Sequence, residues 1–241
     1  MTAGTTAGSV ADAPALGHDG RRDWLLVLDT ATSEIVLAAA GVDGGLVGLA
    51  TWEAGRTHGA QLLPAIGRLT GENNLRRSRI RGIVVGTGPG AFTGLRVGIA
   101  TAKALAHELR VPIVGISTAE ALLEASGAGD RGVLLLPAGP NDRHVIRRRS
   151  SPMLLPGGTE PEIGEGDVLV ALDLADRAPA DAAARGEAGR RGFAAALARM
   201  GAARLANGDA DDLERLVPEY VSLPRGVAAE TGEVAWSRDL R

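Results

Sequence analysis

The feature that most constrains the fold is the stretch at residues 86–109. In it, a glycine-rich loop follows a short apolar run and leads into a long alanine-rich segment. Ile83-Val84-Val85 before the loop is typical of a buried strand. Gly86-Thr87-Gly88-Pro89-Gly90 then places three glycines and a proline in five residues. Glycine permits positive φ and close backbone approach, and proline fixes one φ. With Thr93 as a natural N-cap, the sequence predicts a strand, a stiff loop and a helix whose first N–H groups are free for an anion or a partner.

The local pattern of this loop leaves more than one interpretation. Gly86-x-Gly88-x-x-Ala91 fits the dinucleotide fingerprint, but the acid expected about 20 residues later is not found after the next strand, because Glu120 already lies in a helix signal. A phosphate loop requires Gly-Lys-Ser/Thr at the start of the helix, and Gly94-Leu95-Arg96 does not meet that requirement. A tight turn without any ligand remains as the structural alternative.

Three motifs resemble those of one known family. Gly88-Pro89-Gly90-Ala91-Phe92-Thr93-Gly94-Leu95-Arg96-Val97-Gly98 is similar to the G-P-G-S-F-T-G-[VIL]-R-[IV]-G signature of the TsaB family, also called YeaZ, with Ala91 in place of the usual serine. Leu28-Asp29-Thr30-Ala31-Thr32 resembles the D-T-[AS]-T opening of that family. His58-Gly59-Ala60-Gln61-Leu62-Leu63-Pro64 resembles its H-[ST]-x-x-L-L-P motif. The resemblance covers about Trp24 to Glu124.

The resemblance implies a role in tRNA modification. The TsaB family is the non-catalytic partner in bacterial threonylcarbamoyladenosine synthesis, in which a complex transfers a threonylcarbamoyl group to the adenosine beside the anticodon. It implies a heterodimer with a TsaD-like catalytic subunit, cooperation with a TsaE-like ATPase, and access to tRNA through the complex. We therefore expect no catalytic residue or cofactor of the chain's own, with ATP, magnesium and metal on the partner subunits. A homodimer in the absence of the partner and a cytoplasmic location are also expected.

Two helices are expected to form the partner surface, at 57–70 and 93–109. The second helix has two apolar stripes, Leu95-Ile99-Ala102 and Val97-Ala100-Thr101-Ala104, so one stripe can pack on a sheet while the other meets a partner. The alternative is that the second half of the same chain covers the second stripe. The residues expected at the partner interface are His58, Leu62, Ile66, Thr93, Arg96 and Ile99.

A nucleotide site is the second hypothesis. In the ribonuclease-H-like class, to which the TsaB family belongs, the first hairpin faces the nucleotide phosphates. This implies that Asp29, Thr30 and Thr32, with Gly88 and Gly90 of the loop, contact phosphate or magnesium-bound water. The alternative is that the acid and the two hydroxyls satisfy the hairpin itself. An ATP-dependent kinase or transferase that acts alone is accordingly the competing function.

The order of expected elements predicts an α/β chain. Strands at 24–28, 35–42 and 46–52, the helix at 57–70, and a strand, a helix and a strand at 83–85, 92–109 and 111–115 predict a mixed sheet flanked by helices. This order is similar to the ribonuclease-H-like fold of the actin and Hsp70 class. Strands at 133–136, 144–149 and 168–172, a loop at 153–166 and a helix at 180–200 predict a degenerate second half. We expect a disordered tail at 1–22, an N-terminal subdomain at 23–118, and a second subdomain with a C-terminal tail at 119–241.

Composition argues against several other functions. The chain has no cysteine, which excludes disulfides and thiolate chemistry, and no run of about 18 apolar residues that would span a membrane. The TsaD family carries a His-x-x-x-His metal pair in the helix that matches 57–70, whereas here Leu62 follows His58 at that spacing, so neither a metal site nor peptidase activity is expected. The net charge of −3 gives no general attraction to nucleic acid, and Arg76–Arg81 is expected to be a solvated connection rather than a binding patch.

Overall fold

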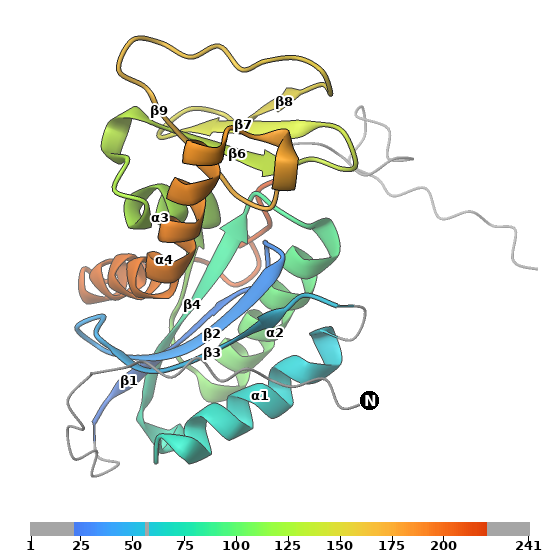
Figure 1. The fold of residues 1–241 in the computed structure, drawn as a ribbon. Helices are drawn as coiled ribbons and strands as arrows, with labels where there is room; N and C mark the ends of the chain where they lie inside the picture. The colour runs from blue at the N-terminus through green and yellow to red at the C-terminus, as the bar shows by residue number, and fades with distance from the viewer. Residues whose placement is uncertain (1–21, 56–57, 221–241) are drawn as a thin grey trace, which may run out of the picture.

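The computed structural model describes residues 22–55 and 58–220 and consists of two β-sheets with helices between and beside them (Figure 1). The tail predicted at 1–22 lies outside the described residues except for Arg22, and so does the last segment, 221–241. Within the described ranges, no helix is long and apolar enough to cross a membrane.

The first sheet has the strand order β3-β2-β1-β4-β5, in which β2 is antiparallel to β1 and to β3 while β4 and β5 run parallel to β1. Its strands are β1 (Trp24–Asp29), β2 (Glu34–Gly41), β3 (Leu46–Glu53), β4 (Ile80–Gly88) and β5 (Ile113–Ser117). Helix α1 (His58–Glu72) joins β3 to β4, α2 (Phe92–Leu109) joins β4 to β5, and α3 (Thr118–Ala125) follows β5. This is the ribonuclease-H-like arrangement, as predicted.

The second sheet is a shortened copy of the first. Its order is β8-β7-β6-β9, again with the second strand antiparallel and the fourth parallel to the first strand of the copy. The strands are β6 (Gly132–Pro137), β7 (Arg143–Arg147), β8 (Met153–Leu155) and β9 (Val168–Ala171), followed by α4 (Ala180–Ala206). Between β8 and β9 a loop replaces the helix that α1 provides in the first copy.

Within the described ranges, three short 3₁₀ turns connect these elements. The turns are η1 (Arg77–Arg79), η2 (Gly129–Arg131) and η3 (Ala175–Arg177).

The prediction of a loop throughout 153–166 was wrong at its start, where β8 pairs with β7. Sequence patterns do not reveal this strand because it is only three residues long and Met153 and Leu154 are exposed, so pairing rather than burial stabilises it.

Both faces of the first sheet are buried, which explains why β1 is a continuous apolar run rather than an alternating one. Trp24, Leu26 and Leu28 point to the face covered by α1 and α2. Leu25 and Val27 point to the opposite face, where they join a core that includes α3, α4 and one face of the second sheet. That core continues across the subdomain boundary predicted after residue 118, which falls at the start of α3.

Small residues let α4 lie between the two sheets (Figure 1). A Cβ atom added to Gly186 would lie 1.8 Å from the carbonyl oxygen of Ala171 in β9. A Cβ atom on Gly201 would lie 2.3 Å from a methyl carbon of Val84 in β4. Glycine at both positions therefore permits the backbone of α4 to approach one strand of each sheet closely.

Candidate functional site

The glycines of the predicted loop lie where the turn between β1 and β2 presses against them. A Cβ atom on Gly90 would lie 2.1 Å from the carbonyl oxygen of Ala31, and one on Gly94 would lie 2.0 Å from that of Thr30. A Cβ atom on Gly98 would lie 2.2 Å from the Thr30 hydroxyl oxygen. The same hydroxyl donates a hydrogen bond to the carbonyl oxygen of Gly94 at 2.7 Å. The two motifs are therefore one packed unit, in which the second motif must be glycine-rich to admit the first.

Asp29 holds this unit together from inside. Its carboxylate is fully buried and accepts hydrogen bonds from the Ala31 amide at 2.8 Å and from the Thr118 hydroxyl at 2.6 Å. The Thr118 oxygen in turn accepts a hydrogen bond from the Gly88 amide at 3.0 Å. Burial raises the pKa of Asp29 to about 6, although both hydrogen bonds favour the ionised form. The polar groups of Asp29 and Thr30 thus satisfy the hairpin and the loop, as in the alternative interpretation, and the phosphate contact stays a prediction.

A cleft of about 800 Å³ opens between the two sheets, beside the loop. Its lining includes Ala31, Thr32, Ser33, Gly90 and Phe92 from the first half, Leu136, Asp142, His144 and Asp173 from the second, and Glu219 and Tyr220 from near the end of the described chain. Of the five residues predicted to contact a nucleotide, Thr32 and Gly90 line the cleft. Asp29, Thr30 and Gly88 are not part of its lining.

The lining of the cleft is acidic. Asp142, Asp173 and Glu219 belong to it, and none of the described residues that line it is a lysine or an arginine. Burial opposes ionisation of Asp173, but hydrogen bonds from Ser33 and an ion pair with Arg190 at 2.5 Å hold its pKa below the usual value. A nucleoside polyphosphate would therefore meet carboxylates here, without the cations that usually bind it.

His144 is the buried imidazole of this cleft. The residue is 6% exposed, and its Nδ1 atom has no hydrogen-bond partner among the described residues. Burial lowers the pKa of His144, so the ring is neutral at pH 7. In the described parts of the chain, no group of three or more histidine, aspartate or glutamate side chains is arranged to hold a metal ion.

The two helices predicted to bind a partner lie side by side on the outer face of the first sheet (Figure 1). Leu62 and Ile99, which we expected at the interface, are 1% and 4% exposed and pack against the sheet, so that assignment was wrong. Ile66 is half-buried beside them. The outward apolar side chain of α1 is instead Leu63, which is 58% exposed.

The second stripe of α2 faces outward. Ala100 and Ala104 are exposed and Val97 and Thr101 are half-buried, whereas all three residues of the first stripe are buried. The alternative that the second half of this chain covers the outward stripe was therefore wrong for the described residues. Together, Leu63, Val97, Ala100, Thr101 and Ala104 form what we call the outer helix face.

The start of α2 differs from the prediction. The helix begins at Phe92, and Ala91 occupies the N-cap position without a side-chain hydrogen bond, so Thr93 is not the N-cap. Thr93 and Arg96 are both exposed on the first turns. The Arg96 guanidinium lies 4.0 Å from the Phe92 ring centre, and its Nε donates to the Tyr220 hydroxyl at 3.1 Å. His58 opens α1, and its side chain lies outside the described part of the structure.

The sequence reasoning missed the segment that carries Tyr220. Residues 207–220, here called the C-terminal strap, return from α4 along the first sheet. The Asp211 amide donates to Ile113 at 2.8 Å, and the Glu219 amide donates to Thr87 at 2.8 Å. The only available signal was the resemblance of Pro218-Glu219-Tyr220-Val221 to a P-x-Y-[LV] motif of the TsaB family.

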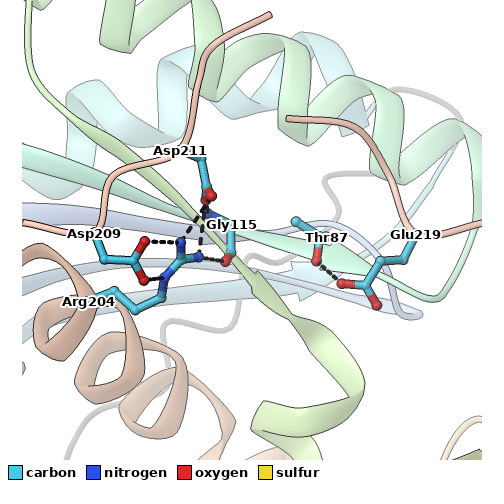
Figure 2. A network of polar contacts seen from close by, with 6 residues as sticks. All are labelled: Thr87, Gly115, Arg204, Asp209, Asp211 and Glu219. Atoms are coloured by element: carbon cyan, nitrogen blue, oxygen red, sulfur yellow. Dashed lines mark hydrogen bonds and ion pairs between the residues drawn. The ribbon is translucent and has the colours of Figure 1, made fainter. Parts of the chain in front are cut away.

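An arginine anchors the strap to α4 (Figure 2). The Arg204 guanidinium forms ion pairs with Asp209 at 2.8 Å and Asp211 at 3.0 Å, and it donates to the carbonyl oxygen of Gly115 at 2.7 Å. Asp211 also accepts a hydrogen bond from the Gly115 amide at 2.6 Å. Hydrogen bonds to Asp209 and then to Asp211 raise the pKa of Arg204 further above its usual value, so the guanidinium stays charged.

Comparison with known proteins finds similarity in sequence and in fold. The model of the family described as tRNA N6-adenosine threonylcarbamoyltransferase, TsaD, matches residues 44–158. A Haemophilus influenzae protein named tRNA threonylcarbamoyladenosine biosynthesis protein TsaB is 34% identical over 104 residues, which cover 42% of this chain and 42% of that protein. The solved structure of YeaZ from Pseudomonas aeruginosa superposes with a TM-score of 0.63 at 21% identity, over 82% of this chain and 99% of that one. The chain is therefore similar to TsaB, also called YeaZ, in sequence over part of its length and in fold through both sheets.

The sequence similarity is confined to part of the chain. The matched stretch spans less than half the length of the curated relatives. For example, an uncharacterized protein of Mycobacterium leprae is 35% identical over 102 residues, which are 41% of this chain and 28% of that protein. The TsaB-family fold itself extends through both sheets, as the structural match shows.

Proposed function

We propose that this protein is the non-catalytic subunit of a complex that synthesises threonylcarbamoyladenosine in tRNA. In this proposal it binds and activates a TsaD-like catalytic subunit through the outer helix face. ATP, magnesium and the catalytic metal belong to the partner subunits, including a TsaE-like ATPase, and tRNA is reached through the complex in the cytoplasm. The chain forms a homodimer through the same face when the partner is absent.

The observation that supports this proposal best is the outer helix face on α1 and α2. Leu63 is 58% exposed, and the neighbouring residues of α2 are valine, alanine and threonine, so another helix can approach closely. The packing of the signature glycines against the β1–β2 turn fixes the start of α2, and α2 carries most of this face. The signature therefore supports a rigid docking surface rather than a ligand loop.

The acidic cleft supports a non-catalytic subunit rather than a kinase or transferase that acts alone. Such an enzyme must bind the phosphates of ATP, and cationic groups or magnesium normally neutralise their charge. The predicted phosphate-contacting acid, Asp29, is buried, and the lining side chains that are charged are carboxylates.

The proposal is tested by depleting the protein from its source organism and quantifying nucleosides in bulk tRNA by mass spectrometry. We expect threonylcarbamoyladenosine to fall several-fold and to return when the wild-type chain is supplied from a plasmid. Other modified nucleosides of the same tRNA serve as the internal control. Unchanged threonylcarbamoyladenosine after complete depletion would refute the proposed function and leave the fold assignment intact.

A further inference from the structure

Five arginines gather at the edge of the first sheet that lies opposite the cleft. The parallel strands β1, β4 and β5 all begin at this edge, and α1 and α2 both end there (Figure 1). The connection from α1 to β4 and the residue after α2 therefore come together. We call this group the arginine edge, and it comprises Arg76, Arg77, Arg79, Arg81 and Arg110.

Fixed contacts give the arginine edge a defined shape. The Trp24 indole donates a hydrogen bond to the carbonyl oxygen of Arg76 at 3.0 Å, which ties the connection to β1. One oxygen of Asp23 lies 3.0 Å from the Nε atom of Arg79 and 3.0 Å from that of Arg81. A hollow of about 560 Å³ lies beside them, and its lining includes Arg77, Arg81, Glu108 and Arg110.

The arginine edge is locally positive on a chain whose net charge is −3. The carboxylate of Asp23 pairs with Arg79 and Arg81, and Glu108 lines the same hollow as Arg77, Arg81 and Arg110. Hydrogen bonding to Arg81 and the charge of Arg79 lower the pKa of Asp23, so this carboxylate is already committed to two of the arginines. Arg76, Arg77, Arg81 and Arg110 remain exposed to solvent.

The chemistry of these side chains fits a row of phosphates. Guanidinium presents a planar fork of donors that matches phosphate oxygens, and it is less strongly hydrated than an ammonium group. Several arginines along one edge suit a polyanion better than a single small ligand. The edge is also continuous with the C-terminal ends of α1 and α2, whose outer side is the proposed partner surface.

We propose that the arginine edge binds the phosphate backbone of tRNA while the catalytic partner holds the anticodon region. This inference rests on the proposed function, because it places the edge next to the partner. It adds a direct contact between this chain and tRNA. The connection that we expected to be a solvated surface thus has a binding role in this proposal.

The structural alternative is that the arginines only stabilise α1 and α2, because cations interact favourably with the negative end of the helix dipole at a C-terminus. A structural role would lower the stability of variants without changing the salt dependence of RNA binding. A phosphate contact would change that dependence, because each contact releases counterions. Each contact contributes about 0.7 to 0.9 to the slope of log Kd against log salt concentration.

The test uses the triple variant Arg77→Ser/Arg81→Ser/Arg110→Asn, with Asn at 110 because that residue has φ of 54° and Asn tolerates this conformation. The variant is assembled with the TsaD-like partner, and binding of an unmodified tRNA transcript is followed by fluorescence anisotropy between 50 and 200 mM salt, the range in which phosphate contacts change affinity most visibly. We expect about tenfold weaker binding and a slope smaller by about 2. The control Arg149→Asn/Arg191→Ser/Arg199→Ser, with Asn at 149 because that residue has φ of 57°, removes three exposed arginines elsewhere and should bind as wild type.

The outcomes separate this inference from the proposed function. A wild-type chain that does not join the partner would overturn both. A complex in which the edge variant binds tRNA with wild-type affinity and salt slope would overturn only the arginine edge, and so would an equal loss in the control variant. If the triple variant does not fold, the double variant Arg77→Ser/Arg81→Ser is measured in the same way, with a slope smaller by about 1 to 2 expected.

Discussion

Asp29 is a carboxylate that the fold places in a fully buried position with a raised pKa of about 6. Because its folded pKa lies above the usual value of 3.8, the folded state binds the proton more tightly than the unfolded state. Asp29 therefore favours the folded state below pH 4, and this contribution is lost as the pH rises towards about 6. At about 1.4 kcal/mol per pKa unit, the loss is on the order of 3 kcal/mol.

Asp29→Asn tests this residue, because asparagine keeps the shape and an acceptor for the Ala31 amide. The free energy of unfolding is measured by urea denaturation from pH 4 to pH 7 for both proteins. We expect the variant to become more stable relative to wild type by up to about 3 kcal/mol across this range. Other titrating groups contribute equally to both proteins, so their contribution cancels in the difference between the two free energies of unfolding. A pH-independent difference would show that Asp29 does not titrate there.

In helices α1 and α2, a charge introduced on the outward side is expected to weaken partner binding, whereas a charge on the inward side is expected to destabilise the monomer. Leu63→Glu places a charge on the outer helix face, where it leaves stability within about 0.5 kcal/mol of wild type. The same charge at a partner interface would be buried unpaired, so we expect binding of the TsaD-like subunit to weaken at least a hundredfold. Size-exclusion chromatography and titration calorimetry measure this. Co-elution with the partner at unchanged affinity would exclude the outer helix face.

Leu62→Glu, one residue earlier in α1, is the matched control. Leu62 is 1% exposed inside the core beneath the helices, so a charge there should destabilise the monomer by several kcal/mol. Thermal unfolding followed by circular dichroism distinguishes the two variants. A folded and stable Leu62→Glu protein would contradict the assignment of the inward side of α1.

The same helices show how far the sequence predicts the elements. The two apolar stripes of α2 are evident from residue spacing, and so is the alternation of strands and helices in the first half. Which stripe faces the sheet is not evident, since Ile99 and Val97 are both β-branched and both stripes contain alanine. Their orientation follows from the contact between the β1–β2 turn and Gly94 and Gly98, which depends on tertiary packing.

At the scale of the whole molecule, the sequence predicts two segments least well: the boundary between the halves near residue 118 and the C-terminal strap. The degenerate second sheet was predicted from its strands, and one core cluster includes residues from both sides of the boundary predicted after residue 118. The C-terminal strap has no regular periodicity, because polar contacts hold most of it, so neither helix nor strand signals reveal it. Leu216 is its buried apolar anchor, packed into the core beneath α1 and α2.

The strap connects the core between the sheets to the start of α2. Arg204 of α4 holds Asp209 and Asp211, and Tyr220 at the other end contacts Phe92 and Arg96. Arg204→Met removes the charged donors but keeps much of the aliphatic packing. Because charge-assisted bonds contribute about 1.5 to 3 kcal/mol and the Arg204 side chain is 29% exposed, we expect a loss of about 2 kcal/mol in the strap's local stability.

Amide hydrogen exchange measures this loss directly. The amides of Asp211, Gly115 and Glu219, whose hydrogen bonds join the strap to the first sheet, should exchange at least tenfold faster in Arg204→Met. Amides of β1 and β2 should change little, because the core around them does not depend on the strap. Arg199→Met, an exposed arginine on the same helix, should exchange as wild type. Unchanged protection at all three amides would mean that the ion pairs of Arg204 add nothing to the position of the strap beside α2.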